Sequence, residues 1–260
     1  MPDETQSRTQ PAPHVIVVSL HKAGTHLMKR LMEEMGYEVT DPETGVTEAA
    51  KTQDPETFLS ALKPNSAYFF HALPIHTFPL GLLQHWRKTG SPPVYYNYRD
   101  PRAVLLSQVN YLLQRNRAQA FTETRYHLLF SDILQAQKTE AAALDVAIEC
   151  MADYLNDNFL GSLWMLHHPR VCRVSYERLV GPSGGGTAES HAAEVNRVLA
   201  HANSRLNPDQ LSSRLYDPTQ RTFHRGQAYA WKDVYSQAQL RAFNEKYRHL
   251  LKLYGYDPVE

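Results

Sequence analysis

The segment from His14 to Leu27 constrains the fold most, because it combines a buried strand, a tight loop and the start of a helix. Its first part, Val15–Leu20, is a short apolar run rich in β-branched residues, which is typical of parallel strands that are buried on both faces. Helical spacing follows, because one broad face carries Leu27, Met28, Leu31, Met32 and Met35. A strand that runs through a loop into a helix in this way is typical of a phosphate-binding site.

The loop at residues 21–26 carries the groups that an anion site needs. Gly24 allows close backbone approach, and a helix that begins at Thr25 or His26 would point the amide groups of its first turn at the anion. Lys22 adds a mobile positive charge. The residue order excludes a Walker A loop, in which the lysine follows the second glycine and precedes a hydroxyl residue that binds magnesium. Taken alone, the segment could also be an ordinary strand-to-helix turn with one exposed lysine.

Strand-like runs recur along the chain, and segments with helical spacing separate them. The further runs are Tyr37–Thr40, which is the weakest, Ala67–His71, Val94–Tyr98 and Val171–Ser175. This alternation predicts an α/β fold in which helices flank a central, mainly parallel sheet of about five strands. The chain has 260 residues, of which 42% are hydrophobic, and is long enough for one well-buried domain, which we expect to span residues 14–260.

The interval from Pro101 to Pro169 is longer than one crossover needs, and it predicts a helical insert above the sheet. The insert divides into the helical patterns Pro101–Arg117, Thr122–Gln137 and Glu140–His167. The glycine-rich residues 181–187 predict a flexible linker, and the polar, proline-containing residues 1–13 predict a disordered N-terminal segment.

Composition argues against several kinds of partner. The 27 basic residues equal the 27 acidic residues, so the chain has no global field that would gather nucleic acid or an anionic membrane. No apolar stretch approaches the ~20 residues that span a bilayer, and residues 1–13 lack the apolar core of a signal peptide, so we expect the cytoplasm as the compartment. The 13 histidines are scattered and form no metal-binding motif, and we expect Cys150 and Cys172 to be buried small hydrophobes.

A second candidate site residue stands at the end of the run Val94–Tyr98. Arg99 follows this strand, and Asp100 is predicted to be the N-cap of the next helix. Ligands of open α/β sheets bind outside the carboxyl ends of the strands, so we expect Arg99 and Lys22 on the same rim. A surface salt bridge is the alternative role for Arg99. Ser107 lies two turns into the helix, and its spacing alone does not place it near Arg99.

These two segments resemble motifs of the sulfotransferases that use 3′-phosphoadenosine 5′-phosphosulfate (PAPS) as sulfuryl donor. Lys22, Gly24 and Thr25 match the family's loop Pro-Lys-Ser-Gly-Thr-Thr-Trp. The remaining positions of that loop are here His21, Ala23, His26 and Leu27. Arg99 and Ser107 are eight residues apart across a strand-to-helix junction, like the arginine and serine of the family's 3′-phosphate motif.

Two later segments carry the same resemblance. Residues 223–232 resemble the family's loop Arg-Lys-Gly-x-x-Gly-Asp-Trp-Lys, with Arg225 in place of the lysine and Gly226 identical. His224 replaces the arginine, which weakens a phosphate clamp, because histidine titrates near pH ~6.5 and lacks a bidentate fork. Tyr176, which begins the run Tyr-Glu-Arg-Leu, resembles a family tyrosine near the adenosine. From its strand alone, Tyr176 is a half-buried packing residue.

The resemblance implies a P-loop NTPase-like sulfotransferase fold that binds PAPS and releases 3′,5′-diphosphoadenosine (PAP), with no metal. The implied cofactor-binding residues are Lys22, Ala23, Gly24, Thr25, His26, Arg99, Ser107, Tyr176, His224, Arg225 and Gly226. Lys22 would also be catalytic, because its charge stabilises the leaving diphosphate. The implied catalytic base is His71, in a segment that resembles the family's Lys-Thr-His-Leu-Pro with one extra residue before the proline, and His76 and His26 are the alternatives.

The implied reaction is transfer of a sulfuryl group to a hydroxyl or amine of a small-molecule acceptor, and we expect a secondary metabolite. The insert together with Tyr95 and Tyr96 is expected to form the acceptor pocket. Acids recur every four residues at Asp145, Glu149, Asp153 and Asp157, and they are either solvated surface or an attraction for a cationic acceptor. A non-catalytic relative that binds nucleotide and a small-molecule kinase of similar fold stay open as alternatives. The sequence does not indicate the oligomeric state.

Overall fold

The computed structural model describes residues 14–40, 62–71, 80–114, 125–215 and 227–258. Its sheet contains β1 (His14–Ser19), β2 (Glu38–Thr40), β3 (Ser66–Phe70), β4 (Val94–Tyr98) and β5 (Val171–Ser175). The strand order is β2-β3-β1-β4-β5, and every neighbouring pair is parallel. The predicted α/β fold with a parallel sheet of about five strands is therefore confirmed.

The central strand β1 is buried on both faces because its side chains alternate between two apolar cores. Ile16 and Val18 belong to one core, and Val15 and Val17 belong to the other. On both sides β1 is covered by neighbouring strands, since Val17 lies opposite Phe69 of β3 and Tyr95 of β4. The apolar, β-branched sequence of β1 is what such a position requires.

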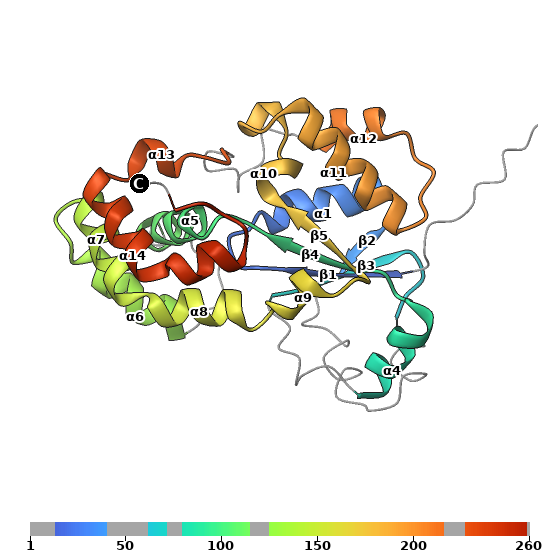
Figure 1. Cartoon of the computed structure of the whole chain (residues 1–260), viewed down its shortest axis with the longest axis horizontal. Helices are drawn as coiled ribbons and strands as arrows, with labels where there is room; N and C mark the ends of the chain where they lie inside the picture. Colours follow the sequence, from blue (N-terminus) through green and yellow to red (C-terminus); the bar gives the residue numbers. More distant parts are fainter. Residues whose placement is uncertain (1–13, 41–61, 72–79, 115–124, 216–226, 259–260) are drawn as a thin grey trace, which may run out of the picture.

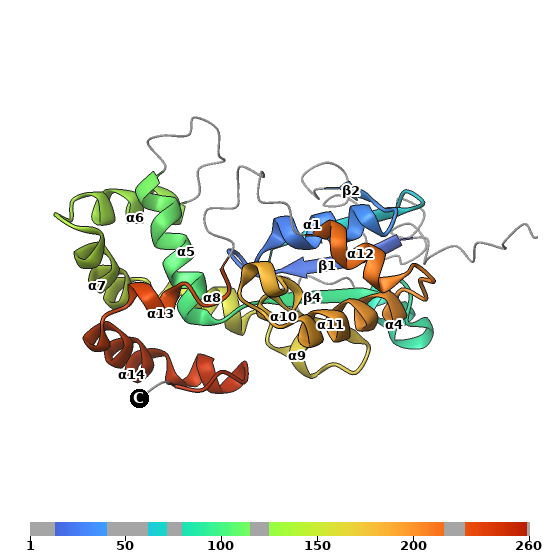
Figure 2. The ribbon, with the colours of Figure 1, turned by 90° about the horizontal axis from the view of Figure 1, so that it is seen from above.

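Helices cover the sheet in two layers. One layer contains α1 (Thr25–Glu34), the short α10 (Tyr176–Leu179), α11 (Ala188–His201) and α12 (Pro208–Leu215), which appear on one side of the strands in Figure 1. The other core is formed with α4 (Leu80–Thr89), α5 (Pro101–Gln114), α13 (Trp231–Val234), α14 (Gln237–Leu253) and the remaining helices of the insert. Figures 1 and 2 both show α5, α6, α7 and α14 grouped beside the end of the sheet at which β4 runs into α5.

The helical insert is present, but its third predicted helix is wrong as one continuous element. The insert contains α5, α6 (Arg125–Gln135), α7 (Glu140–Cys150), α8 (Ala152–Leu160) and the short α9 (Trp164–His167). Met151 interrupts the run with φ −94° and ψ 26°. The Met151 amide still donates a hydrogen bond to the Ala147 carbonyl, and the Met151 carbonyl still accepts one from the Leu155 amide. The helical spacing of the side chains therefore continues through the break, and the sequence pattern does not reveal it. Residues 115–124, which include two predicted helix ends, lie outside the described residues.

Several local predictions can be compared with the structure. Asp100 caps α5 through a hydrogen bond from the Arg102 amide to Oδ1 (2.9 Å). Residues 181–187 contain the 3₁₀ helix η3 (Pro182–Gly184), and the flexibility of this segment stays a prediction. Cys172 is buried as expected, whereas Cys150, the last residue of α7, is exposed. Residues 1–13 lie outside the described part of the chain, and no helix in that part is long and apolar enough to cross a membrane.

Candidate functional site

The loop after β1 turns sharply into α1 through two residues of left-handed backbone. Lys22 has a φ of 62° and Gly24 a φ of 89°, and α1 begins at Thr25, as expected. A Cβ atom on Gly24 would lie 2.3 Å from the ring of Tyr176. The loop therefore needs glycine at this position both for its conformation and for its contact with α10.

Buried polar groups tie the loop to β1 and β4. The Asn97 Nδ2 donates to the Ser19 hydroxyl and to the Ala23 carbonyl, both at 3.0 Å. The hydroxyls of Ser19 and Thr25 lie 2.8 Å apart. Asn97 is a site residue that the sequence reasoning missed, although an asparagine in the buried run Val94–Tyr98 was a signal that could have found it.

Lys22 lies in a partly desolvated place above an aromatic ring. Its Nζ is 3.8 Å from the centroid of the Tyr111 ring on α5. Burial, with a smaller contribution from the nearby charge of Arg99, lowers the pKa of Lys22 from 10.5 to about 8. Tyr111 was also missed, because no local pattern in the sequence links α5 to the loop after β1.

Arg99 joins three separate parts of the chain. Its Nη1 donates to the Lys22 carbonyl (3.3 Å) and its Nη2 donates to the Gln227 carbonyl (2.9 Å). The Arg99 guanidinium also lies 4.1 Å above the ring of Tyr176. Arg99 is therefore beside Lys22 on one rim of the sheet, as predicted.

The predicted 3′-phosphate segment lies only partly in the described region. His224, Arg225 and Gly226 lie outside it, whereas Gln227 bonds to Arg99 and Ala228 donates to the Gly184 carbonyl at 2.8 Å. The chain at Gln227 therefore reaches the same rim. Ser107 is half-buried on α5, and its convergence with Arg99 stays a prediction.

His71 stands at the end of β3, next to the end of β1. Its Nδ1 is 3.0 Å from the Ser19 carbonyl oxygen. The His71 ring stacks on the ring of His21, with centroids 4.3 Å apart and planes at 17°. His76 lies outside the described residues, and His26 is exposed on the first turn of α1. The structure thus places His71 against the loop that carries Lys22.

The expected contribution of Tyr95 and Tyr96 to an acceptor pocket is wrong. Both side chains are fully buried in the two cores. The Tyr95 hydroxyl donates to the Val198 carbonyl (3.0 Å), and the Tyr96 hydroxyl lies 2.6 Å from that of Tyr254. β4 lies between β1 and β5 with helices on both faces, so neither ring reaches a surface.

The buried carboxylate of Glu177 is the centre of a hydrogen-bond network that supports the turn at Arg99. Glu177 accepts hydrogen bonds from the Asp100 amide (2.9 Å), the Ser175 hydroxyl (2.8 Å) and the Tyr256 hydroxyl (2.9 Å). Burial raises the pKa of Glu177, although the Asp100 amide, the charge of Arg99 and the Ser175 hydroxyl act in the opposite direction. The network joins the ends of β4 and β5 and so fixes the backbone on which Arg99 and Tyr176 stand.

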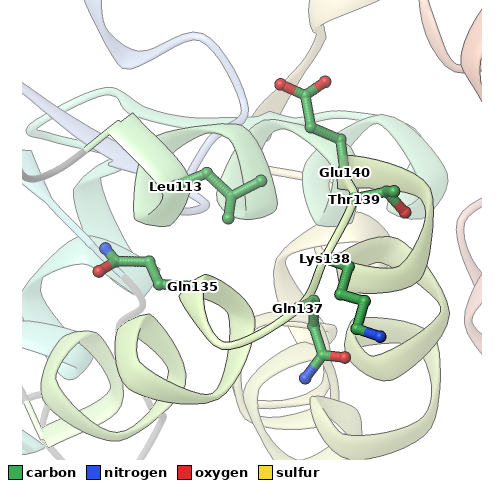
Figure 3. Close-up of a pocket in the computed structure, with 6 residues that line it drawn as sticks. All are labelled: Leu113, Gln135, Gln137, Lys138, Thr139 and Glu140. Atoms are coloured by element: carbon green, nitrogen blue, oxygen red, sulfur yellow. The ribbon is translucent and has the colours of Figure 1, made fainter.

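A surface cavity lies away from these residues. It has a volume of about 450 Å³ and is lined by Leu113, Gln135, Gln137, Lys138, Thr139 and Glu140 (Figure 3). It lies between the end of α5, the end of α6 and the start of α7, and none of the predicted site residues in the described part of the chain lines it. The described residues also hold no cluster of three or more histidine, cysteine, aspartate or glutamate side chains with metal-binding geometry.

A scan against models of known protein families finds no match to this sequence, and a search of curated proteins finds none. Solved structures do match. The mouse sulfotransferase SULT7A1, crystallised with PAP, superposes with a TM-score of 0.61 at 15% identity over 94% of this chain and 89% of its own. The chain has the fold of a sulfotransferase.

Retinol dehydratase shares this sulfotransferase fold. Its structures with androsterone and the inactive cofactor PAP, and with retinol and PAP, each superpose with a TM-score of 0.53 at 14% identity. Each match covers 94% of this chain and 83% of the retinol dehydratase chain. The sulfotransferase fold expected from four short motifs is therefore confirmed over almost the whole chain.

Proposed function

We propose that this chain is a PAPS-dependent sulfotransferase, which transfers a sulfuryl group to a hydroxyl or amine of a small-molecule acceptor such as a secondary metabolite. The observation that carries the proposal is the convergence of Lys22, Arg99 and the segment at Gln227 on one rim of a sulfotransferase fold. These groups come from sequence positions far apart, so their proximity is a property of the fold.

The residues on this rim fit an anionic nucleotide. Among the described residues, the hydrogen bonds of Arg99 go to main-chain carbonyls, and its buried Nε has no partner. The neighbouring ammonium of Lys22 is desolvated, which favours the acquisition of a counter-ion. In the described region no ion pair joins Lys22 or Arg99 to a carboxylate, although Arg99 interacts electrostatically with Glu177, and two cations side by side favour a ligand with phosphate groups.

The chain's own groups match the steps of in-line sulfuryl transfer. When bound, PAPS supplies a sulfuryl group whose bond to the 5′-phosphate oxygen breaks as a bond to the acceptor oxygen or nitrogen forms. Lys22 stabilises the negative charge that develops on the departing phosphate oxygen. His71 takes the proton that the acceptor loses, through Nε2, because its Nδ1 faces the Ser19 carbonyl.

A cationic acceptor is a narrower version of the proposal. The acidic residues predicted to attract it are divided by the break at Met151 between α7 and α8. Asp145 accepts a hydrogen bond from the Gln239 amide at 2.8 Å, and Asp153 and Asp157 lie one helical turn apart on α8, so these two acids are tested together. Two double variants, one with asparagine and one with serine in place of both aspartates, should raise the KM for a cationic acceptor. The KM for a neutral acceptor should be unchanged in both variants.

Two measurements test the main proposal. PAP at 100 times its Kd should stabilise the protein against thermal unfolding by about 2.7 kcal/mol, while ATP with magnesium should give a smaller effect. Incubation with PAPS and a panel of hydroxyl- and amine-containing metabolites should then give products heavier by one SO₃ group. Lys22→Met should abolish this transfer.

Each result separates the proposal from its alternatives. Stabilisation by PAP with no transfer to any acceptor would favour a non-catalytic nucleotide-binding protein. Preferential stabilisation by ATP with magnesium, together with phosphoryl transfer, would favour a small-molecule kinase. Absence of any stabilisation by PAP would overturn the proposal.

A further inference from the structure

Two histidine rings lie against each other where β1 and β3 end. The planes of His21 and His71 are nearly parallel, with an angle of 17° and a centroid separation of 4.3 Å. His71 is the base in the function proposed above, whereas His21 has no role in it. The stack therefore raises the question of what His21 does for His71.

The contact of His71 with β1 determines which of its nitrogens can act as a base. A carbonyl oxygen accepts hydrogen bonds and cannot donate them, so the contact at 3.0 Å requires a proton on Nδ1 of His71. In the neutral ring the lone pair is then on Nε2. This hydrogen bond fixes the position of Nδ1, but it still allows the imidazole ring to tilt about that atom. A flat ring stacked on its face opposes such a tilt.

His21 is in turn held by the insert. Its main-chain amide donates to Asn158 Oδ1 (3.1 Å), and its carbonyl accepts from Asn158 Nδ2 (3.3 Å). Asn158 lies on α8 and is 4% exposed. Because the amide oxygen and nitrogen meet opposite partners, the orientation of the Asn158 side chain is determined. Asn158 therefore fixes the backbone from which the His21 ring projects.

We propose that His21 is a positioning residue for His71, and that Asn158 holds His21 in place for this task. His21 does not contact the reacting atoms in this scheme. It acts by keeping His71 in the orientation and tautomer in which Nε2 can accept a proton. The catalytic consequence rests on the proposed function, whereas the positioning of the His71 ring does not.

Turnover measurements test the catalytic consequence. His21→Leu removes the flat ring and should lower kcat by up to about 10²-fold, the cost of misplacing a catalytic group by roughly 1 Å. His21→Phe keeps a flat ring and should retain most of the turnover. The Kd for PAP should be unchanged in both variants, and Asn158→Ala should lower kcat in the same direction as His21→Leu.

Imidazole ¹⁵N NMR of the protein without ligands tests the positioning itself. His71 should show the tautomer with the proton on Nδ1 in the wild type and in His21→Phe, and a mixture of tautomers in His21→Leu. An unchanged His71 spectrum in His21→Leu would overturn the inference, as would equal loss of turnover in the leucine and phenylalanine variants. A parallel loss of PAP affinity would also overturn it, because His21 would then support the loop as a whole.

The spectrum also separates this inference from the proposed function. A wild-type protein that transfers no sulfuryl group, but shows the expected tautomer and its dependence on His21, would refute the function and retain the positioning.

Discussion

Raising the pH from 7 to 9 should weaken the binding of PAP about tenfold, because Lys22 loses its proton in this interval. Its pKa is lowered to about 8 by burial and by the charge of Arg99. Without ligand, about nine tenths of the Lys22 side chains are charged at pH 7 and about one tenth at pH 9. The pKa of Lys22 therefore falls inside the range in which binding is easily measured.

The sign of the effect follows from the charge of the ligand. A bound phosphate favours the ammonium form and moves the pKa of Lys22 back toward its ordinary value of 10.5. The contribution of the Lys22 charge to the affinity for PAP is then fully present below pH ~8. It is lost as the pH rises from about 8 toward the pKa of Lys22 in the complex. If the pKa of the complex reaches its ordinary value, the loss between pH 7 and 9 is about tenfold, or about 1.4 kcal/mol. Binding should take up about half a proton at pH 8 and about 0.9 at pH 9.

Titration calorimetry with PAP at these pH values, in buffers with different heats of ionisation, measures both the affinity and the proton uptake. Lys22→Arg is the matched control, because arginine stays charged throughout this range and should remove the proton uptake and the pH dependence. Affinity that is independent of pH in the wild type would refute the reasoning. The same pH dependence in Lys22→Arg would assign it to another group.

Two substitutions test the packing that supports the site. Gly24→Ala should lower the free energy of unfolding by about 1–2 kcal/mol from its positive φ alone and displace Tyr176, and denaturant unfolding should show that adding Tyr176→Ala recovers part of the loss. Additive losses would contradict the contact. Arg102→Met leaves the carboxylate of Asp100 buried without its ion pair of 2.8 Å and should cost about 3–5 kcal/mol by the same measurement, with partial recovery on adding Asp100→Asn. A cost within the ~0.5 kcal/mol typical of surface substitutions would show that the pair is solvated.

The sequence was informative where structure depends on neighbouring residues. The β-branched run of β1, the cap at Asp100 and the glycine at position 24 each follow from local rules of burial, capping and backbone sterics. The position of Arg99 beside Lys22 could be predicted as well, because the carboxyl ends of parallel strands share one rim. The cofactor-binding and catalytic roles of these residues stay predictions.

Contacts between distant segments could not be predicted in this way. Tyr111 lies under Lys22, and Asn158 binds His21, because of how the insert packs against the sheet. The complete burial of the Tyr95 and Tyr96 side chains depends on the strand order, which places β4 between β1 and β5. The break at Met151 could not be recognised from the sequence. The helical hydrogen bonds on both sides of Met151 are retained, so the side chains keep their helical spacing across the break.

The shape of the loop at residues 21–26 is itself a product of such distant contacts. His21 is bound through its main chain by Asn158 of α8, the Lys22 carbonyl by Arg99 after β4, and the Ala23 carbonyl by Asn97 within β4. A positive φ at Lys22 costs of order 1–3 kcal/mol and persists where the surrounding structure holds it. Three consecutive residues are thus held by side chains from parts of the chain that meet only in the folded domain. The loop is therefore preorganised before any ligand arrives, and the cost of its conformation is met during folding rather than during binding.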